Sequence, residues 1–246
     1  MLMRPLARIA LVPLLLVQGL WVRAGAQFLP EPPGDRGGVF GSGPDLGLLV
    51  LGDSSAAGVG AQNQKTAMPA QLVFLLAQNA RVHYRVEAIT GATSRSTLKS
   101  MDTVTYGSAD LCIVVLGVND VTRATSPRRF VRNLARIEAA LKSKTGTRHI
   151  IFSGVPPMGH FPLLPNPLRW VLGQDAQRLD AALQAFCAES QDRSHLPLDL
   201  PLTPDMVASD GFHPSETAHA LWAKMLARHI LDVLPMAQGS DLDLRL

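Results

Sequence analysis

Three short segments of this 246-residue chain carry side chains that together could catalyse acyl transfer. Ser54 ends a Gly-Asp-Ser run that follows an apolar stretch, and Asn119 lies in Gly-Val-Asn-Asp after another. Asp210 and His213 form an Asp-x-x-His pair ahead of a predicted helix. A serine hydroxyl attacks a carbonyl poorly until a base takes its proton, and a histidine oriented by a carboxylate can be that base. The amide of Asn119 can donate a hydrogen bond to the oxygen that becomes negative during the attack.

The order of these motifs along the chain resembles that of the SGNH (GDSL-type) hydrolases, and Gly91 fits the family's remaining element, a glycine after the second strand. The resemblance covers residues of about 47–230. It implies a metal-independent serine esterase in which Ser54 is acylated and Asp210 orients His213. It also implies an oxyanion hole built from the N–H groups of Ser54 and Gly91 and the amide of Asn119.

The sequence departs from familiar hydrolase patterns at two points. The Gly-x-Ser-x-Gly elbow is absent around Ser54. Ser55 stands where the family usually has leucine, so the neighbouring hydroxyl is an alternative nucleophile.

Other interpretations of the same residues stay open. Asp-x-x-His is also typical of a helix N-terminus, where Asp210 would cap free N–H groups. The glycines at 52, 58 and 60 are compatible with a non-catalytic, flavodoxin-like module that binds a ligand. They match neither Gly-x-Gly-x-x-Gly nor the lysine-bearing phosphate loop. If an alcohol replaced water as acceptor, the same site would make the chain an acyltransferase.

Strands and helices are predicted to alternate from residue 47 onward. Apolar runs predict strands over 48–51, 84–89, 111–116, 149–153 and 196–200, the last weakened by flanking prolines. Helical periodicity predicts helices over 68–79, after Pro127, around 179–186 and after Pro214. This alternation predicts an α/β sandwich of three layers, with a parallel sheet between helices. The family resemblance implies a flavodoxin-like sheet of five strands in the order 2-1-3-4-5, which makes the strand ends before Ser54, Gly91 and Asn119 neighbours.

A Pro-rich apolar segment, residues 155–173, follows the fourth predicted strand and should overhang the same edge of the sheet. We expect Met158, Phe161, Leu164 and Trp170 to wall a substrate pocket or form a lid over it. The alternative is a loop folded onto the core. A pocket of this kind favours small or lipid-like acyl esters over thioesters or acetylated sugars.

The first 26 residues are predicted to be a signal peptide or an N-terminal anchor. Arg4 and Arg8 precede the apolar residues 9–22, and Ala24-Gly25-Ala26 has the small-x-small form of a cleavage site. Cleavage would give an exported protein, periplasmic or secreted; an uncleaved segment 9–22 would contact or anchor in a membrane. Residues 27–46, rich in Pro and Gly, predict a linker. Residues 47–236 form the predicted hydrolase domain, and 237–246 a tail.

Composition argues against nucleic acid as a partner. Arg4, Arg8 and Arg23 lie in the first 26 residues, which hold no acidic residue, and the other 20 basic residues balance the 20 acidic ones. No basic stripe interleaved with aromatic residues is evident in the sequence. Neither the two cysteines nor the remaining histidines have the spacing of a metal site, so no cofactor is predicted. The expected partner is a small-molecule acyl ester, and the oligomeric state stays open.

Overall fold

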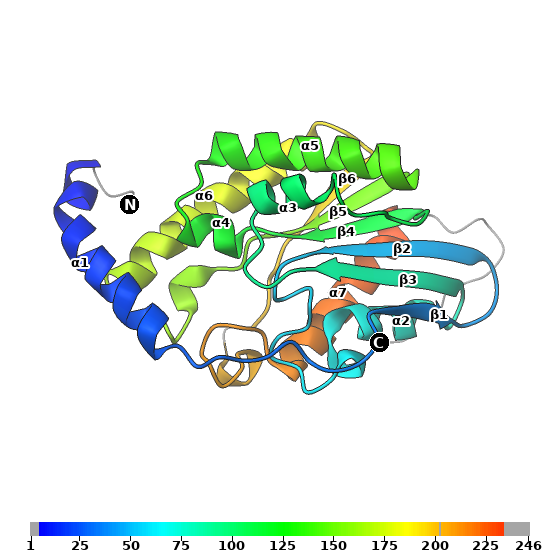
Figure 1. Cartoon of the computed structure of the whole chain (residues 1–246), viewed down its shortest axis with the longest axis horizontal. Coiled ribbons are helices and arrows are strands. Elements are labelled where there is room, and N and C mark those ends of the chain that lie inside the picture. The colour runs from blue at the N-terminus through cyan, green and yellow to red at the C-terminus, as the bar shows by residue number, and fades with distance from the viewer. Residues whose placement is uncertain (1–4, 202, 234–246) are drawn as a thin grey trace.

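The computed structural model describes residues 5–201 and 203–233, with side chains described from residue 10 onward. A mixed sheet lies between two layers of helices (Figure 1). Its strands are β1 (Gly37–Phe40), β2 (Asp45–Gly52), β3 (Arg81–Ala88), β4 (Leu111–Val115), β5 (His149–Ser153) and β6 (Arg193–Leu196). The α-helices are α1 (Pro5–Gly25), α2 (Met68–Leu76), α3 (Ser94–Ser100), α4 (Val118–Thr122), α5 (Pro127–Thr145), α6 (Leu168–Ala188) and α7 (Glu216–Val233). Short 3-10 turns are η1 (Gln64–Thr66), η2 (Met158–His160) and η3 (Pro204–Met206).

The strand order β1-β3-β2-β4-β5-β6 confirms the predicted α/β fold. The five strands from β2 to β6 are parallel and have the predicted order, with β2 between β3 and β4. Gly52, the last residue of β2, pairs with Ala88 of β3 and Val115 of β4. The carboxyl ends of these three strands therefore lie side by side.

A sixth strand, β1, corrects the prediction of a plain linker over residues 27–46. Gly37 and Gly38 begin β1, which pairs antiparallel with β3 at the sheet edge. Phe40 packs against Tyr84, with ring centroids 5.9 Å apart. The strand was hidden because two of its four residues are glycines and it lies on an edge, where no apolar pattern is required. The predicted tail, 237–246, lies outside the described residues.

Helices cover both faces of the sheet, as its apolar strands require. Helices α3, α5 and α6 pack on one face around Phe130, Ile137 and Leu183, and helices α2 and α7 pack on the other around Leu72 and Trp222. Helix α5 shows why the sequence folds this way. Pro127 opens it, its apolar residues recur on one stripe, and Gly146 ends it in a left-handed conformation.

Helix α1 packs on the α6 side of the molecule rather than standing free (Figure 1). Leu15 and Val22 contact the core cluster of that side. Gln18 donates to the carbonyl of Asn166 at 2.7 Å and accepts from the N–H of Leu168 at 3.0 Å. Among the described residues, no helix is long and apolar enough to cross a membrane.

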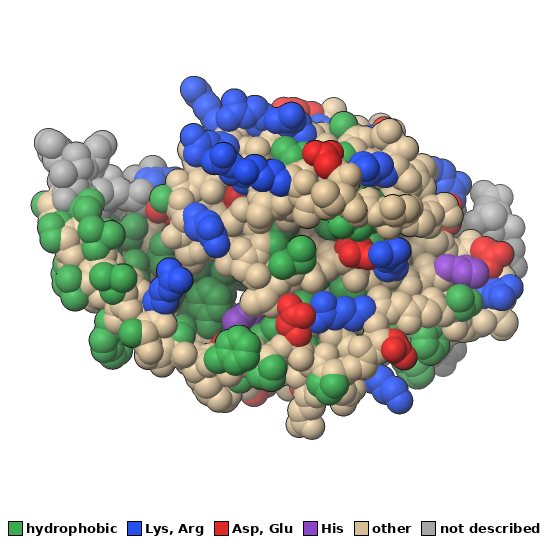
Figure 2. All heavy atoms as spheres, viewed as in Figure 1, with side chains coloured by type: hydrophobic (Ala, Val, Ile, Leu, Met, Phe, Trp, Pro, Cys, Tyr) green, Lys and Arg blue, Asp and Glu red, His purple; other side chains and the backbone are tan. Residues whose placement is uncertain are grey.

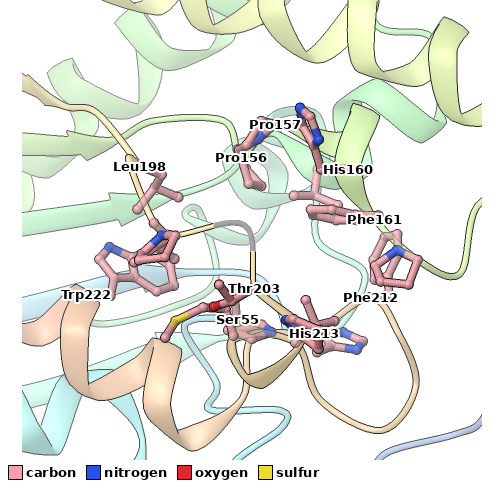
Figure 3. Close-up of a pocket in the computed structure, with 18 of the residues that line it drawn as sticks. Ser55, Pro156, Pro157, His160, Phe161, Leu198, Thr203, Phe212, His213 and Trp222 are labelled. Carbon is pink, nitrogen blue, oxygen red and sulfur yellow. The ribbon is translucent and has the colours of Figure 1, made fainter.

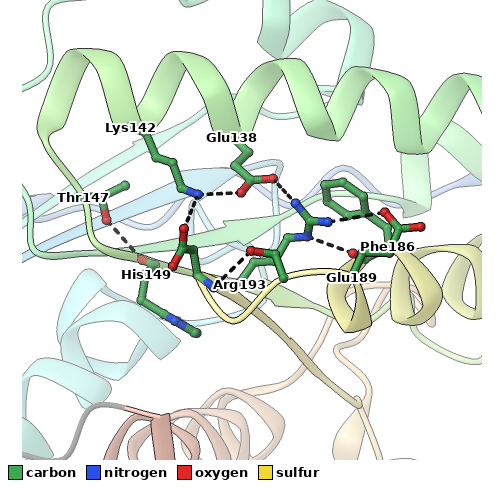
Figure 4. A network of polar contacts seen from close by, with 9 residues as sticks. Glu138, Lys142, Thr147, His149, Phe186, Glu189 and Arg193 are labelled. Atoms are coloured by element: carbon green, nitrogen blue, oxygen red, sulfur yellow. Dashed lines mark hydrogen bonds and ion pairs between the residues drawn. The ribbon is translucent and has the colours of Figure 1, made fainter.

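A buried ion pair fastens α5 to β6 and α6 (Figure 4). The Glu138 carboxylate accepts from Arg193 Nη1 at 2.8 Å and pairs with Lys142 Nζ at 2.9 Å. Lys142 also pairs with Asp192 at 3.2 Å. The Arg193 guanidinium lies 3.8 Å from the centre of the Phe186 ring. These polar contacts let β6 be half-buried although three of its four residues are polar.

Two buried titratable side chains respond to pH in opposite directions. His219 Nδ1 accepts from the N–H of Met68, and its Nε2 donates to the carbonyl of Val59, each at 3.2 Å. Burial lowers the pKa of His219 from 6.5 to about 4. Asp53, directly after β2, is also buried, and burial raises its pKa from 3.8 to about 6 against the lowering effect of its hydrogen bonds.

We expect replacement His219→Gln to change how stability depends on pH. Between pH 4 and 6.5 the imidazole of His219 binds a proton in the unfolded chain but not in the folded chain. The contribution of His219 to the free energy of unfolding therefore increases as pH rises. The free energy of unfolding of the parent minus that of His219→Gln should grow by ~1.4 kcal/mol per pH unit across this window. Urea unfolding at several pH values measures it.

The variant Asp53→Asn serves as the control of opposite sign. Folded Asp53 keeps its proton up to about pH 6, so its contribution to stability is lost as pH rises from 3.8 to 6. The parent-minus-variant difference should therefore fall over this range. Equal pH slopes in the parent and His219→Gln would contradict the assignment.

Candidate active site

Every residue of the predicted catalytic cluster lies at the carboxyl edge of the parallel strands. Ser54 follows β2, Gly91 follows β3 and Asn119 lies in α4 just after β4. The turn Asp210–His213 comes from the far end of the chain and precedes α7. The strand order therefore brings the β2, β3 and β4 loops together, and the α7 turn reaches them from the side.

His213 bridges the serine and the aspartate. Its Nε2 lies 3.0 Å from Ser54 Oγ, and its Nδ1 lies 2.5 Å from Asp210 Oδ2. These two partners determine the tautomer of the His213 ring. The carboxylate of Asp210 can only accept from Nδ1, so the proton is on Nδ1, and Nε2 can accept from the hydroxyl of Ser54. This is the arrangement that a serine nucleophile needs.

Asp210 is held by its own turn. Its Oδ1 accepts from the N–H groups of Phe212 at 2.9 Å and His213 at 3.0 Å. Burial raises the pKa of Asp210, but the hydrogen bonds from the His213 ring and from these two N–H groups outweigh it, and the net shift is downward. Asp210 thus stays ionised. One carboxylate oxygen therefore faces the His213 ring and the other holds the turn. The helix-cap interpretation is wrong, because α7 begins only at Glu216, where the hydroxyl of Ser215 accepts from the N–H of Ala218 at 3.2 Å.

The loop after Ser54 packs directly against the segment that carries His213. Gly60 has φ of +100°, and a Cβ there would lie 2.0 Å from the carbonyl oxygen of Pro214. Glu216, at the start of α7, accepts from the N–H of Gln62 at 2.8 Å and from the hydroxyl of Thr66 at 2.6 Å. The loop that follows Ser54 and the turn that carries His213 therefore pack together as one unit.

Three N–H groups remain free around Ser54. Within the part of the chain that the structure describes, the backbone N–H groups of Ser54 and Gly91 donate no hydrogen bond. The Asn119 amide donates one bond, to Asp53 Oδ2 at 3.3 Å, which leaves its second hydrogen available. Gly91 has φ of +80°, and a Cβ there would meet nothing within 4 Å, so its backbone faces open space. Unpaired donors at a half-buried site are suited to an oxyanion.

Two buried aspartates hold these loops in place. Asp53 Oδ1 accepts from the N–H of Ser55 at 3.0 Å while its other oxygen takes the Asn119 amide. Asp120 accepts from the N–H and the hydroxyl of Ser94 at 2.8 and 2.7 Å. One carboxylate thus joins the β2 loop to the β4 loop, and the other joins the β4 loop to α3.

An apolar cavity of about 380 Å³ opens beside Ser54 and His213 (Figure 3). Its size is that of a pocket for a small molecule. The walls come mainly from residues 156–162 after β5, residues 198–201 and 203–207 after β6, and the turn before α7 together with Trp222 of that helix. The lining side chains include Pro156, Phe161, Leu198, Leu200, Met206, Val207, Phe212 and Trp222. Among the described residues, no group of three or more His, Cys, Asp or Glu side chains is arranged to hold a metal ion.

Only one of the four predicted pocket residues lines this cavity. Phe161 does, and its ring packs edge-on against Phe212 with centroids 5.2 Å apart. Met158 and Leu164 are instead buried in the core, and Trp170 is 42% exposed on the outside of α6. Two causes account for the correction. Helix α6 begins at Leu168, so the last six residues of the 155–173 segment, Trp170 included, are helix rather than loop. The earlier part folds partly onto the core, where Met158 and Leu164 are buried.

Sequence reasoning misses the second wall, residues 198–201 and 203–207. The sequence predicts a strand over 196–200, but β6 ends at Leu196 and the residues after it line the cavity beside Ser54. The signal was present in the alternation of apolar residues with prolines, at Leu198, Leu200, Pro201 and Pro204. Apolar residues that prolines exclude from a strand are candidates for a pocket wall.

Comparison with known proteins agrees with this geometry. The model of the GDSL-like Lipase/Acylhydrolase family matches residues 50–221, which run from the end of β2 through β6 and include the whole cluster around Ser54. The chain is 26% identical over 201 residues to the GDSL-like esterase Rv1075c of Mycobacterium tuberculosis. That match covers 77% of this chain but only 63% of the relative.

Solved structures share the fold at low sequence identity. TesA superposes with a TM-score of 0.60 at 21% identity, covering 76% of this chain and 99% of TesA. The esterase EstA from Pseudoalteromonas sp., in a structure inhibited by monoethylphosphonate, gives 0.61 at 19% identity, covering 77% and 99%. Family model, fold and residue order agree, and this chain belongs to the GDSL-like lipase/acylhydrolase family.

Proposed function

We propose that this protein hydrolyses carboxylic esters through an acyl-enzyme formed on Ser54. The observation that carries the proposal is the bridge from Ser54 through His213 to Asp210 at the mouth of an apolar cavity. Family membership supports an ester hydrolase in general terms. A non-catalytic binding module would not require a serine, a histidine and an aspartate hydrogen-bonded in this order.

The geometry suggests the order of events. His213 Nε2 takes the hydroxyl proton as Ser54 Oγ attacks the ester carbonyl, and Asp210 stabilises the imidazolium that forms. The carbonyl oxygen, now negative, receives hydrogen bonds from the free N–H groups of Ser54, Gly91 and Asn119. His213 then gives its proton to the departing alcohol. In the second half, His213 takes a proton from water as the water attacks the acyl carbon, and then returns that proton to Ser54 Oγ as the bond from Ser54 to the acyl group breaks and the acid is released.

The cavity supports an uncharged, apolar substrate. Its walls are aliphatic, aromatic and proline side chains, and its polar groups are those of the catalytic turn, Ser55, Thr203 and His160. A charged group buried there would lose its hydration without gaining a partner. We therefore favour esters whose acyl or alcohol part is a hydrocarbon over acetylated sugars.

Labelling with a fluorophosphonate probe should separate Ser54 from its neighbour. The probe phosphonylates a serine only when a base activates it, so Ser54→Ala should abolish labelling and ester hydrolysis together. Ser55→Ala is the matched control: Ser55 lines the same cavity but forms no hydrogen bond with His213 in the described part of the chain, and labelling should persist. Mass spectrometry of the labelled peptide identifies the site. Labelling that survives Ser54→Ala would reject the proposed nucleophile.

Replacement Asn119→Ala should slow the chemical step without weakening substrate binding. It removes one donor to the transition-state oxygen, a loss of roughly 10²–10³ in kcat with KM changed little. Steady-state kinetics on an activated ester measure both constants. A rise in KM at constant kcat would instead place Asn119 in substrate binding.

Phe161→Ala should alter preference for acyl length. Removing this ring from the cavity wall costs apolar contact with a long acyl chain, so kcat/KM for an octanoate ester should fall at least about tenfold relative to an acetate ester. Trp170→Ala is the control, since that ring lies outside the cavity. Equal loss on both esters in Phe161→Ala would mean that the ring supports Phe212 and His213 rather than the substrate.

A further inference from the structure

Several exposed arginines lie near the carboxyl edge of the parallel strands, where Ser54 is found. We call Arg95, Arg123, Arg128, Arg129 and Arg132 the arginine rim; all five are exposed. Figure 2 shows basic side chains clustered over the helices on this side of the molecule. No acidic side chain among the described residues lies within ion-pairing distance of any rim arginine. The charge balance of the whole chain conceals this local excess.

The position of the rim works against the stability of α5. Arg128 and Arg132 are four residues apart on one helix face, where like charges repel. They also lie in the first two turns, where the helix dipole disfavours cations. Lys142, near the other end of the same helix, has two acidic partners, Glu138 and Asp192. The arginines at the start of α5 therefore lack the internal neutralisation that the same helix provides for Lys142.

The topology places the rim beside the active site. Helices of this fold run antiparallel to the strands, so the first turns of α3 and α5 lie at the carboxyl edge of the sheet. Arg123 follows α4, the short helix that carries Asn119. The rim thus borders the edge where Ser54 and the apolar cavity are found.

Helix α1 brings an apolar surface to the same edge. Gln18 is bonded at the start of α6, which is at this edge, while Leu15 and Val22 face the core. On the outer side, Leu16 and Val17 are 62% and 64% exposed, and Leu20 and Trp21 are each 68% exposed. Figure 2 shows hydrophobic side chains over this helix, in the same view as the basic cluster. Contiguous exposed apolar side chains of this kind mark an interaction surface.

We propose that this edge docks on the surface of an anionic lipid bilayer. The exposed apolar side chains of α1 enter the interface between head groups and acyl chains, and the arginine rim binds lipid phosphates. A nucleic acid would also bind the rim but would leave the aliphatic side chains of α1 without a partner. Docking in this orientation would turn the mouth of the cavity toward the lipid. The use of this orientation to take up an ester substrate rests on the proposed function, whereas the docking itself does not.

Co-sedimentation of the full-length chain with vesicles tests the docking. We use vesicles of phosphatidylcholine alone and of phosphatidylcholine mixed with phosphatidylglycerol, at low and high salt. The variant Arg128→Gln/Arg129→Gln/Arg132→Gln should bind the anionic vesicles roughly 100-fold more weakly, about fivefold per arginine. Its matched control, Arg81→Gln/Lys144→Gln/Arg148→Gln, removes the same charge at the opposite edge and should bind within about threefold of the parent.

The contribution of α1 has its own readout. Leu16→Ser/Leu20→Ser should weaken binding by about tenfold or more, because less apolar area enters the interface. In a Trp170→Phe background, two tryptophans remain, the exposed Trp21 and the buried Trp222, which already lies in an apolar environment. The emission should shift to shorter wavelength when anionic vesicles are added, and this shift should disappear in Trp21→Phe/Trp170→Phe. Ser54→Ala should bind vesicles like the parent, which separates a failure of docking from a failure of the proposed hydrolysis.

Several results would overturn the proposal. These are no binding of the full-length chain to anionic vesicles, equal losses in the rim variant and its matched control, and an unchanged Trp21 spectrum. Binding of duplex DNA as tight as that of vesicles and insensitive to Leu16→Ser/Leu20→Ser would assign the rim to nucleic acid instead. Native protein that begins near Gln27, without α1, would also reject docking through this helix.

Discussion

The parallel pairing of β2 with both β3 and β4 is the constraint on which the site depends. Because all three strands run in the same direction, their carboxyl ends meet at one edge of the sheet. The segment after each strand places a different residue of the site at that edge. Ser54, Gly91 and Asn119 are far apart in the sequence, yet each follows its strand by only a few residues. The short loops leave little freedom, and Asp53 ties two of them together through Ser55 and Asn119.

Two aspartates near the site show how environment divides labour between identical side chains. Asp210 is surrounded by donors, and its pKa is held below the ordinary value, so it can face the His213 ring as an anion. Asp53 is fully enclosed with fewer donors, and burial raises its pKa to about 6. The first is suited to stabilising an imidazolium, and the second to holding backbone and amide groups in place.

The residues of the candidate site could be predicted from the sequence more completely than the strands and loops that surround it. Small and polar residues at strand ends identify Ser54 and Asn119 because a parallel sheet has few other uses for them there. Strand β6 could not be read in this way: Arg193, Ser194 and His195 are polar, and they are half-buried only because Glu138, His149 and Asp180 pair with them from other elements. Such long-range partners leave no local pattern, which is why the fifth predicted strand was placed too late and the pocket wall behind it was missed.

The glycine at position 60 carries a consequence for how this enzyme family member can vary. Gly60 packs directly on the main chain of Pro214, and a Cβ at position 60 would lie 2.0 Å from the Pro214 carbonyl oxygen, so this backbone contact requires glycine. A methyl group at position 60 would push the turn that carries His213 away from the loop after Ser54. The distance between His213 and Ser54 would then increase. The spacing between the Ser54 hydroxyl and the His213 imidazole thus depends on the absence of one carbon atom at position 60, together with the hydrogen bonds that Glu216 accepts from Gln62 and Thr66.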